Sequence, residues 1–471
     1  MSELNEVLSA VGNSVAVEGT AVKVKDAAKL RAHIGKLVEF SALRSGDVQG
    51  WARYIVRGAA LELGIIPSSI HELYMARGRG DVPLTFTTPA LNLRVLSYQS
   101  ARAVFRTAKK MNGGAFIFEI ARSEMGYTAQ RPAEYSTNIL AAAIAEDWKG
   151  PVFIQGDHFQ MSAKKYGSDP QAEINAVKDL AREAIAAGFF NIDVDTSTLV
   201  DVSKPTVPEQ QVTNCNLSAE FAAFIRELEP KGLTISIGGE IGEVGGHNST
   251  EEELRAFMDG FDAGMKKRAA GKPGLSKISI QTGTSHGGTV LPDGTLAKVS
   301  IDFDTLRELS RVARRDYHLG GTVQHGASTL PEDAFHKFVE NEAIEVHLAT
   351  NFMTMFYDNA PRGLRQEMYA WLDKNSAADR KPDMTDEQFY YKTRKNALGA
   401  FKSQMYALPA SEMDKLTSAW QAQFEKLFNL LGVKDTRQYV EKTVKSVTVA
   451  PDMKFYLGKE VSEAMADDLQ D

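Results

Sequence analysis

The sequence predicts an α/β protein, a (β/α)8 TIM barrel with helical extensions at both ends. Between residues 86 and 352, apolar runs of strand length alternate with helical segments, as such a barrel requires. Three of the runs lead directly to a histidine, at the strand end where a barrel carries its active site. No glycine-rich dinucleotide fingerprint follows an early strand, which disfavours the alternative of an open doubly wound sheet.

Eight runs rich in β-branched and aromatic residues are the expected strands. They cover residues 89–95, 115–121, 152–157, 189–195, 234–241, 277–282, 321–325 and 344–349. Helices are expected between them at residues 99–110, 172–187, 300–317 and 330–341. Gly188 and Gly320 follow two of these helices, where a left-handed residue commonly ends one.

Extensions flank the predicted barrel, which occupies residues 86–352. Residues 1–85 are expected to form a helical N-terminal extension, because residues 47–63 carry an amphipathic pattern and Pro83 marks a break before the first barrel strand. Residues 353–471 are expected to form a helical C-terminal extension, with aromatic residues spread through charged sequence.

Composition restricts the class of function. The chain of 471 residues carries 54 basic and 61 acidic residues, and its net charge of −7 argues against general binding to nucleic acid. It has no apolar run long enough to span a bilayer and no signal-peptide pattern at its start. A single cysteine, Cys215, excludes an internal disulfide framework and suits a reducing compartment. We therefore expect a cytoplasmic enzyme with a small-molecule substrate and neither nucleic-acid nor membrane partners.

Three histidines share one sequence context. They end the segments Val152-Phe-Ile-Gln-Gly-Asp-His158, Ile278-Ser-Ile-Gln-Thr-Gly-Thr-Ser-His286 and Gly321-Thr-Val-Gln-His325. Three neutral imidazoles at the mouth of a barrel would bind zinc and leave one coordination position open, as in catalytic zinc sites. A lone histidine is more often a satisfied polar residue, but three in matching contexts favour a metal site.

Carboxylates at the same strand ends complete the predicted site. Asp157, Asp195 and Glu240 each join a hydrophobic strand to a turn on the expected active face, so we assign them functional roles. Because Asp157 directly precedes His158, the two side chains are expected to leave the strand in different directions. Asp193 is expected to be a barrel-interior or capping residue.

The loops after the seventh and eighth strands predict an anion site. They contain His325-Gly-Ala-Ser328 and His347-Leu-Ala-Thr-Asn351, and phosphate sites in barrels are commonly built from these two loops with backbone amides and a hydroxyl. Gly287 after the sixth strand would let its backbone approach a ligand equally closely. The sequence therefore favours a phosphorylated substrate held at the barrel mouth.

From about residue 89 to residue 351 the chain resembles the class II, metal-dependent fructose-bisphosphate aldolase family. That family has an Asp-His pair after its third strand, matched by Asp157-His158, and a Gly-(Thr/Asn)-x-His-Gly turn after its sixth, matched by Gly283-Thr-Ser-His-Gly287. Its His-Gly-(Gly/Ala)-Ser turn is matched by His325-Gly-Ala-Ser328, and the start Pro89-Ala-Leu-Asn92 agrees as well. The helical C-terminal region is similar to the extension of the longer branch of the family.

The resemblance implies roles for individual residues. Asp157 is similar to the general acid/base, and the implied cofactor is one catalytic zinc ion, with a second divalent cation as an option. The implied zinc ligands are His158, His286 and His325, and the carboxylates implied to hold a displaced or second cation are Asp195 and Glu240. The implied contacts to the substrate and its phosphate are Asn92, Gly287, Gly326, Ser328, His347 and Thr350.

The resemblance also implies a homo-oligomeric lyase of sugar metabolism, such as an enzyme of glycolysis. The implied reaction is the reversible retro-aldol cleavage of a ketose phosphate or bisphosphate, such as fructose 1,6-bisphosphate, through an enediolate. Zinc would stabilise the enediolate as a Lewis acid, and Asp157 would move the hydroxyl proton.

The chain departs from the family at positions that contact substrate. His347 stands where the family usually has Asn, and Ala349-Thr-Asn351 replaces an Asp-rich strand end. His247-Asn-Ser-Thr250 replaces the acidic run that carries a mobile catalytic Glu. Glu251 and the two acids after it are expected to begin a helix that the preceding Ser or Thr caps.

Two alternatives to a bisphosphate aldolase remain open. A metal-dependent aldolase or epimerase acting on another ketose or keto-sugar acid would use the same chemistry with different contacts to the substrate. A non-catalytic aldolase-like partner subunit would keep the barrel, but the three histidines together with Asp157 argue against it. Arg122 and Arg362 are the candidates for gripping a distal phosphate.

Overall fold

The computed structural model describes residues 2–242, 247–283, 291, 301–327 and 330–458. Eight parallel strands form a closed barrel, in which each strand pairs with the next along the chain and the last pairs with the first. They are β4 (Thr88–Asn92), β5 (Ile117–Ala121), β6 (Gly150–Gln160), β7 (Asn191–Asp195), β8 (Ser236–Glu240), β9 (Lys277–Ile280), β10 (Thr322–Gln324) and β11 (Glu345–Leu348). All eight predicted strands and the (β/α)8 class are confirmed.

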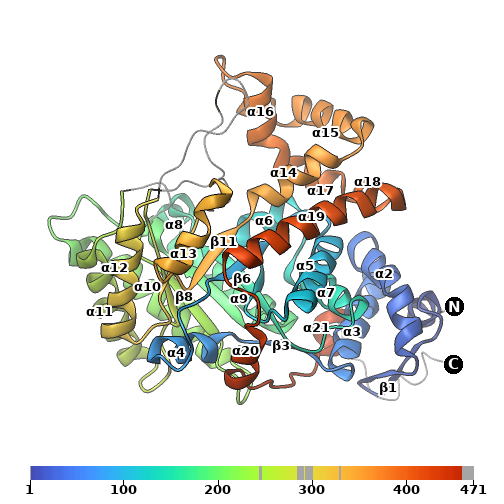
Figure 1. The fold of residues 1–471 in the computed structure, drawn as a ribbon, viewed down its shortest axis with the longest axis horizontal. Helices are drawn as coiled ribbons and strands as arrows, with labels where there is room; N and C mark the ends of the chain where they lie inside the picture. Colours follow the sequence, from blue (N-terminus) through green and yellow to red (C-terminus); the bar gives the residue numbers. More distant parts are fainter. Residues whose placement is uncertain (1, 243–246, 284–290, 292–300, 328–329, 459–471) are drawn as a thin grey trace.

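Helices between the strands cover the outside of the barrel (Figure 1). Three of the four predicted helices are confirmed, as α5 (Ser97–Met111), α9 (Pro170–Ala187) and α12 (Phe303–Tyr317). The remaining helices of this region are α6 (Arg122–Tyr127), α7 (Pro132–Ala145), α8 (Ala163–Ser168), α10 (Val207–Leu228), α11 (Glu251–Arg268) and α13 (His336–Glu340). Short 3-10 turns lie at Ser197–Leu199 and Glu332–Ala334.

Two local predictions are wrong. A continuous helix over residues 330–341 does not form, because Pro331 has extended backbone angles and only a 3-10 turn precedes α13. Gly188 ends α9 in the left-handed conformation as predicted, but His318, with φ +58°, ends α12 in place of Gly320. Gly320 is needed for close approach instead, since a Cβ there would lie 2.9 Å from the Cβ of Tyr74.

The N-terminal extension is helical as predicted, with additional short strands. Its helices are α1 (Glu3–Ala10), α2 (Ala27–Leu43), α3 (Gly46–Glu62) and α4 (His71–Arg79). The hairpin β1 (Val15–Glu18) and β2 (Ala21–Val24) was not predicted, and neither was β3 (Ile65–Ser68), which pairs in parallel with the start of β6. Strands of four residues are too short for the alternation of apolar and polar residues to predict them.

The C-terminal extension is helical as well. Its helices are α14 (Thr350–Asn359), α15 (Arg362–Asn375), α16 (Asp386–Thr393), α17 (Ala397–Ala400), α18 (Lys402–Tyr406), α19 (Ala410–Leu430), α20 (Arg437–Thr443) and α21 (Met453–Leu457), with 3-10 turns at Ala377–Asp379 and Arg394–Asn396. Helix α19 lies against α5 and α14, and α21 lies against α3 of the other extension (Figure 1). One hydrophobic core runs from the N-terminal helices through the barrel layer to α19. The predicted division of the chain into an N-terminal extension, a barrel and a C-terminal extension at residues 85 and 352 therefore stays a prediction. Helix α14 crosses the predicted boundary at residue 352.

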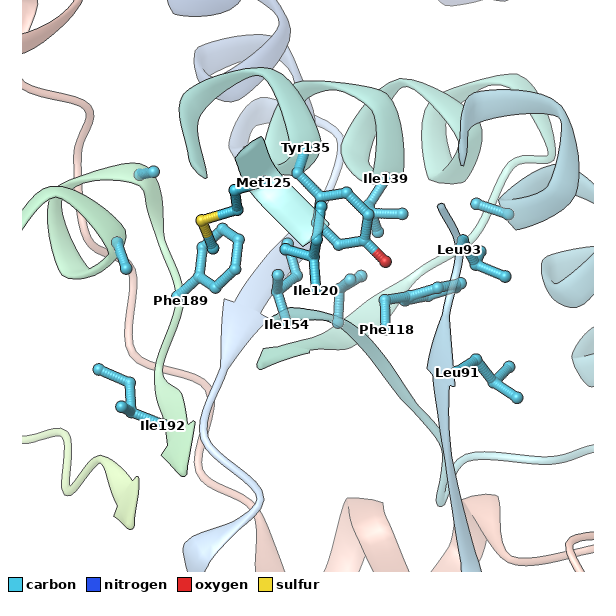
Figure 2. Close-up of a cluster of buried hydrophobic side chains, with 14 of the residues drawn as sticks. Leu91, Leu93, Phe118, Ile120, Met125, Tyr135, Ile139, Ile154, Phe189 and Ile192 are labelled. Carbon is cyan, nitrogen blue, oxygen red and sulfur yellow. The ribbon is translucent and has the colours of Figure 1, made fainter. Parts of the chain in front are cut away.

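The core between strands and helices fixes the barrel from outside. Figure 2 shows Tyr135 and Ile139 of α7 pointing toward Ile120 and Phe118 of β5, with every one of these side chains fully buried. The Tyr135 hydroxyl also donates a hydrogen bond to the backbone carbonyl of Glu119, with 2.7 Å between the oxygens. This contact ties α7 to the strand that carries Glu119 into the barrel.

No helix in the described ranges combines the length and the apolar content that crossing a bilayer requires.

Acid should destabilise this fold through His71, the first residue of α4. Burial, followed by the nearby Arg226 and Arg79, lowers the pKa of His71 from 6.5 to about 3. Between these pKa values the unfolded chain binds a proton that the folded chain does not, so stability rises with pH across this window. At pH 5 the cost of His71 is about 2 kcal/mol. His71→Gln should remove that cost, measured as a smaller difference between urea unfolding curves at pH 7 and pH 5.

The exposed His33 provides the control, because His33→Gln should keep the pH dependence of the unmodified protein. An unchanged acid sensitivity in His71→Gln would contradict the assignment.

Candidate active site and metal centre

A bulge in β6 shapes the centre of the site. The pairing of β6 with β7 shifts register between Gly156 and Phe159, and His158 adopts a left-handed backbone with φ +41°. Non-glycine residues rarely adopt this conformation, and bulges beside active sites commonly redirect side chains. A Cβ on Gly156 would lie 2.3 Å from the Phe159 ring, so the bulge requires glycine there.

The bulge overturns one prediction. Instead of leaving the strand in different directions, the side chains of Asp157 and His158 converge, with Asp157 Oδ1 3.7 Å from His158 Nε2. An unbroken strand would have separated them across its two faces.

His158 faces two carboxylates from the next strands. Its Nδ1 lies 2.9 Å from Asp195 Oδ2 and 3.3 Å from Glu240 Oε2. Asp195 is held in place by Gln160, whose amide donates to Oδ2 at 2.6 Å, and by the Ser197 hydroxyl and amide, which donate to Oδ1. The predicted carboxylates at the ends of β7 and β8 therefore meet the first predicted metal ligand.

Electrostatics in this group suit a cation. Burial, with the neighbouring Asp195, raises the pKa of Glu240 to about 8. Burial alone would lower the pKa of His158, but Asp157 and Glu240 outweigh it and hold that pKa well above its usual range. Glu240 Oε1 is buried and has no hydrogen-bond partner among the described residues. A divalent cation would satisfy this oxygen and release the proton from His158.

His325, at the end of β10, joins the same centre. Its ring centroid lies 4.3 Å from that of His158 and 4.1 Å from that of His347. Asp157, His158 and His325 form one group whose ligand atoms all lie within 4.8 Å of one another, and His158, Asp195 and Glu240 form a second. The structure thus brings together two of the three predicted zinc ligands; His286 lies outside the described residues.

His347, at the end of β11, is buried against Asp157. Its Nδ1 lies 3.1 Å from both Asp157 Oδ1 and Glu119 Oε1, and its Nε2 lies 2.6 Å from Glu345 Oε1. Burial would lower the pKa of His347, but Glu119 and Asp157 outweigh it and raise that pKa well above its usual range. Both ring nitrogens therefore already contact carboxylates, which leaves neither directed to a phosphate as the sequence had suggested.

A buried lysine, Lys277, faces the carboxylates of Asp193 and Glu345 in the barrel interior. Lys277 Nζ on β9 lies 2.9 Å from Asp193 Oδ1, 2.5 Å from Glu345 Oε1 and 2.8 Å from Gln155 Oε1. Gln155 in turn donates to Glu119 at 2.8 Å. Asp193 is thus the barrel-interior residue that was predicted.

Sequence reasoning missed Glu119, Lys277 and Glu345. A signal was present, because each is a charged residue within a buried apolar strand, and such residues are almost never buried without partners.

Toward the mouth, Asn92 links Asp157 to the surface. Its amide donates to Asp157 Oδ2 and to Glu124 Oε2, both at 2.9 Å. Arg94 Nε donates to Glu124 Oε1 at 2.5 Å, with 16% of the Arg94 side chain exposed. Arg94 is therefore connected to Asp157 through Glu124 and Asn92. Arg122, which the sequence suggested for the distal phosphate, is paired with both carboxylate oxygens of Glu173 instead.

The predicted phosphate contacts are only partly described. Gly326 has a left-handed backbone with φ +70° directly after His325, and Thr350 is buried as the first residue of α14. Their strands β10 and β11 are paired, so these two residues follow neighbouring strand ends. Gly287 and Ser328 lie outside the described residues. The predicted helix start after Thr250 is confirmed, since Thr250 caps α11 and Glu253 completes a capping box.

A sequence model described as fructose-bisphosphate aldolase class-II matches residues 85–421, more than half of the chain. The chain belongs to the class II fructose-bisphosphate aldolase family. None of the curated proteins that were compared matches it.

Comparison with solved structures finds similar chains at low sequence identity. The chain is similar to the fructuronate-tagaturonate epimerase UxaE of Cohnella laeviribosi at 12% identity and a TM-score of 0.52, over 90% of each chain. It is also similar to the fructose-bisphosphate aldolase of Campylobacter jejuni at 18% identity and a TM-score of 0.46, over 79% of this chain and 97% of that one. The YdjI aldolase of Escherichia coli is similar at 14% identity and a TM-score of 0.41, over 71% and 96%. At 12% identity the likeness to the epimerase concerns the fold alone, and the reaction has to be derived from the site.

The protein should bind a divalent metal, with zinc expected, through His158, His286 and His325. Each imidazole supplies one nitrogen, and its loss leaves a three-ligand site incomplete. Elemental analysis of the purified protein should find metal in the unmodified chain and much less in His158→Ala, His286→Ala and His325→Ala. The exposed His336 gives a matched control, His336→Ala, which should keep its metal. Equal metal content in all five proteins would refute the site.

Proposed function

We propose that the protein is a metal-dependent class II aldolase that cleaves a ketose phosphate, with fructose 1,6-bisphosphate as the reference substrate. The observation that carries this proposal is the placement of Asp157. Its carboxylate is fixed by Asn92 and His347 and lies beside His158 and His325. A base held beside a group of metal ligands is what retro-aldol cleavage of a ketose needs.

The metal would be held by His158 and His325 together with His286, and Asp195 and Glu240 would hold a displaced or second cation. When bound, such an ion acts as a Lewis acid toward the substrate carbonyl. The orphaned Glu240 oxygen and the nitrogen and carboxylate donors around it are consistent with zinc.

Asp157 would act as the base. Burial would raise its pKa, but His158 and His347 outweigh burial and hold the pKa well below its usual range, so the carboxylate is ionised at neutral pH. It accepts the proton of the substrate hydroxyl next to the bond that breaks. That oxygen becomes the aldehyde carbonyl, the carbon–carbon bond breaks, and its electron pair goes to the ketone fragment as an enediolate.

The phosphate of the ketone fragment would lie at the ends of β10 and β11. The Gly326 backbone and the Thr350 hydroxyl at the start of α14 support this placement, since helix starts favour anions. Gly287 and Ser328 would add the remaining contacts. A cytoplasmic location, homo-oligomeric assembly and a place in glycolysis remain predictions from the sequence.

An epimerase or aldolase acting on another ketose or keto-sugar acid is the second candidate. It is favoured by one feature, the replacement of the family's acidic run by His247-Asn-Ser-Thr250, because the proton-carrying Glu of that run is then missing. His247 contacts Glu253 at 2.6 Å, so that region is tied to the start of α11.

A panel of ketose phosphates and keto-sugars, assayed with and without chelator, separates the two candidates. We expect aldehyde release from a ketose phosphate, lost on chelation and restored by zinc. In Asp157→Asn, metal content and folding should be retained while turnover falls roughly 10²–10⁴-fold, the usual contribution of a general acid/base.

The matched control is Asp201→Asn, a carboxylate in an exposed loop, which should keep normal turnover. Near-normal turnover in Asp157→Asn would rule out the role of Asp157, and inversion of a keto-sugar without cleavage would favour the epimerase.

A phosphate ion should bind beside Gly326 and Thr350. In crystals soaked with inorganic phosphate, we expect the anion between the ends of β10 and β11, where amides and a hydroxyl can donate to it. Thr350→Val removes one donor and should weaken inhibition by inorganic phosphate several-fold. If no anion binds there, the substrate is better sought among non-phosphorylated sugars.

A further inference from the structure

A chain of buried charged groups runs from the lower barrel to Asp157. Lys277 Nζ contacts Glu345 Oε1 at 2.5 Å, Glu345 Oε1 contacts His347 Nε2 at 2.6 Å, and His347 Nδ1 contacts Asp157 Oδ1 at 3.1 Å. The members come from β9, β11 and β6, and none is more than 5% exposed. We call these four residues the Lys277–Asp157 chain.

Asp157 is held from two sides by this arrangement. Its Oδ1 faces His347, and its Oδ2 accepts a hydrogen bond from Asn92 at 2.9 Å. Because His347 and Asn92 lie on different strands and contact different oxygens, the plane of the carboxylate is fixed beside His158 and His325.

His347 is itself prevented from turning. Its second nitrogen contacts Glu345, whose other oxygen accepts a hydrogen bond from the Tyr74 hydroxyl. Lys277 holds Glu345 from below and is fixed in turn by Asp193 and Gln155. The imidazole therefore bridges two carboxylates on opposite sides, and rotation would break both contacts.

We propose that His347, held by Glu345 and Lys277, is a positioning residue that sets the orientation of the Asp157 carboxylate for proton transfer. This inference rests on the proposed function, because Asp157 has to be the base. It assigns His347 a role toward Asp157 in place of the contact to substrate phosphate that the sequence suggested. Misplacing a reacting group by a small distance slows a reaction without weakening substrate binding to the same extent.

The first test compares His347→Gln and Glu345→Gln with the unmodified enzyme on a substrate that the latter cleaves. Each variant should lose about 10–100-fold in kcat, as is usual when a partner of an active-site group is removed. KM should stay within about twofold, and metal content by elemental analysis should not change. Glu345→Gln keeps the size of the side chain and an amide donor, so it remains informative if His347→Gln does not fold.

A purely structural role predicts a different pattern. Glu229→Gln disrupts the pair of Arg226 on α10 and Glu229 directly after this helix, and no hydrogen bond or ion pair among the described residues joins this pair to the Lys277–Asp157 chain. This control should lower the melting temperature and leave kcat unchanged. If His347→Gln and Glu345→Gln behave like Glu229→Gln, the positioning role is refuted.

A double-mutant cycle gives the second test. If His347 acts through Asp157, then Asp157→Asn combined with His347→Gln should turn over no more slowly than Asp157→Asn alone. Losses that multiply would overturn the proposal. Normal turnover in Asp157→Asn would instead refute the proposed function, so the two failures are distinguishable.

A crystal structure of His347→Gln gives a readout that needs no activity. The Asp157 carboxylate should be rotated or disordered relative to the unmodified enzyme, while His158 and His325 keep their places. An Asp157 carboxylate in its original orientation would overturn the inference.

Discussion

The interior of a closed eight-stranded barrel has to be filled by side chains that the strands themselves supply. In this protein, the layer below the mouth is filled with charged groups in place of apolar ones. Glu119, Asp157, Asp193 and Glu345 enter it from four strands, and Lys277 and His347 are the cations that face them. The site above depends on how this charge is balanced.

The charged groups shift one another's pKa values. Burial, together with Asp157 and Glu345, raises the pKa of Glu119 well above its usual range despite His347. Asp157 stays ionised because His158 and His347 both face it. Asp195 and Glu240 then add carboxylates on the far side of His158. The carboxyl groups of Asp157, Asp195 and Glu240 therefore surround His158, and a divalent ion bound there would favour the ionised form of Glu240.

The sequence allowed the fold to be predicted because its signals are local. Each barrel strand is a short apolar run, and histidine or carboxylate residues follow at the end that faces the mouth. The bulge at His158 could not be predicted, since it depends on the register between β6 and a strand more than thirty residues away. The same holds for β3, whose partner is the start of β6. The direction of His347 was missed for a related reason: its partners come from β5 and β6 as well as from its own strand.

The buried charges of this layer indicate a role in function more than a role in stability. A buried ion pair is often no more stabilising than apolar groups of the same shape, whereas removing one partner leaves an uncompensated charge and is strongly destabilising. A barrel that needed only to fold would be served by an apolar layer like the one outside it, where Phe118, Ile120 and Tyr135 meet (Figure 2). The charged layer instead fixes the carboxylate of Asp157 beside His158 and His325, a geometry that apolar packing cannot provide.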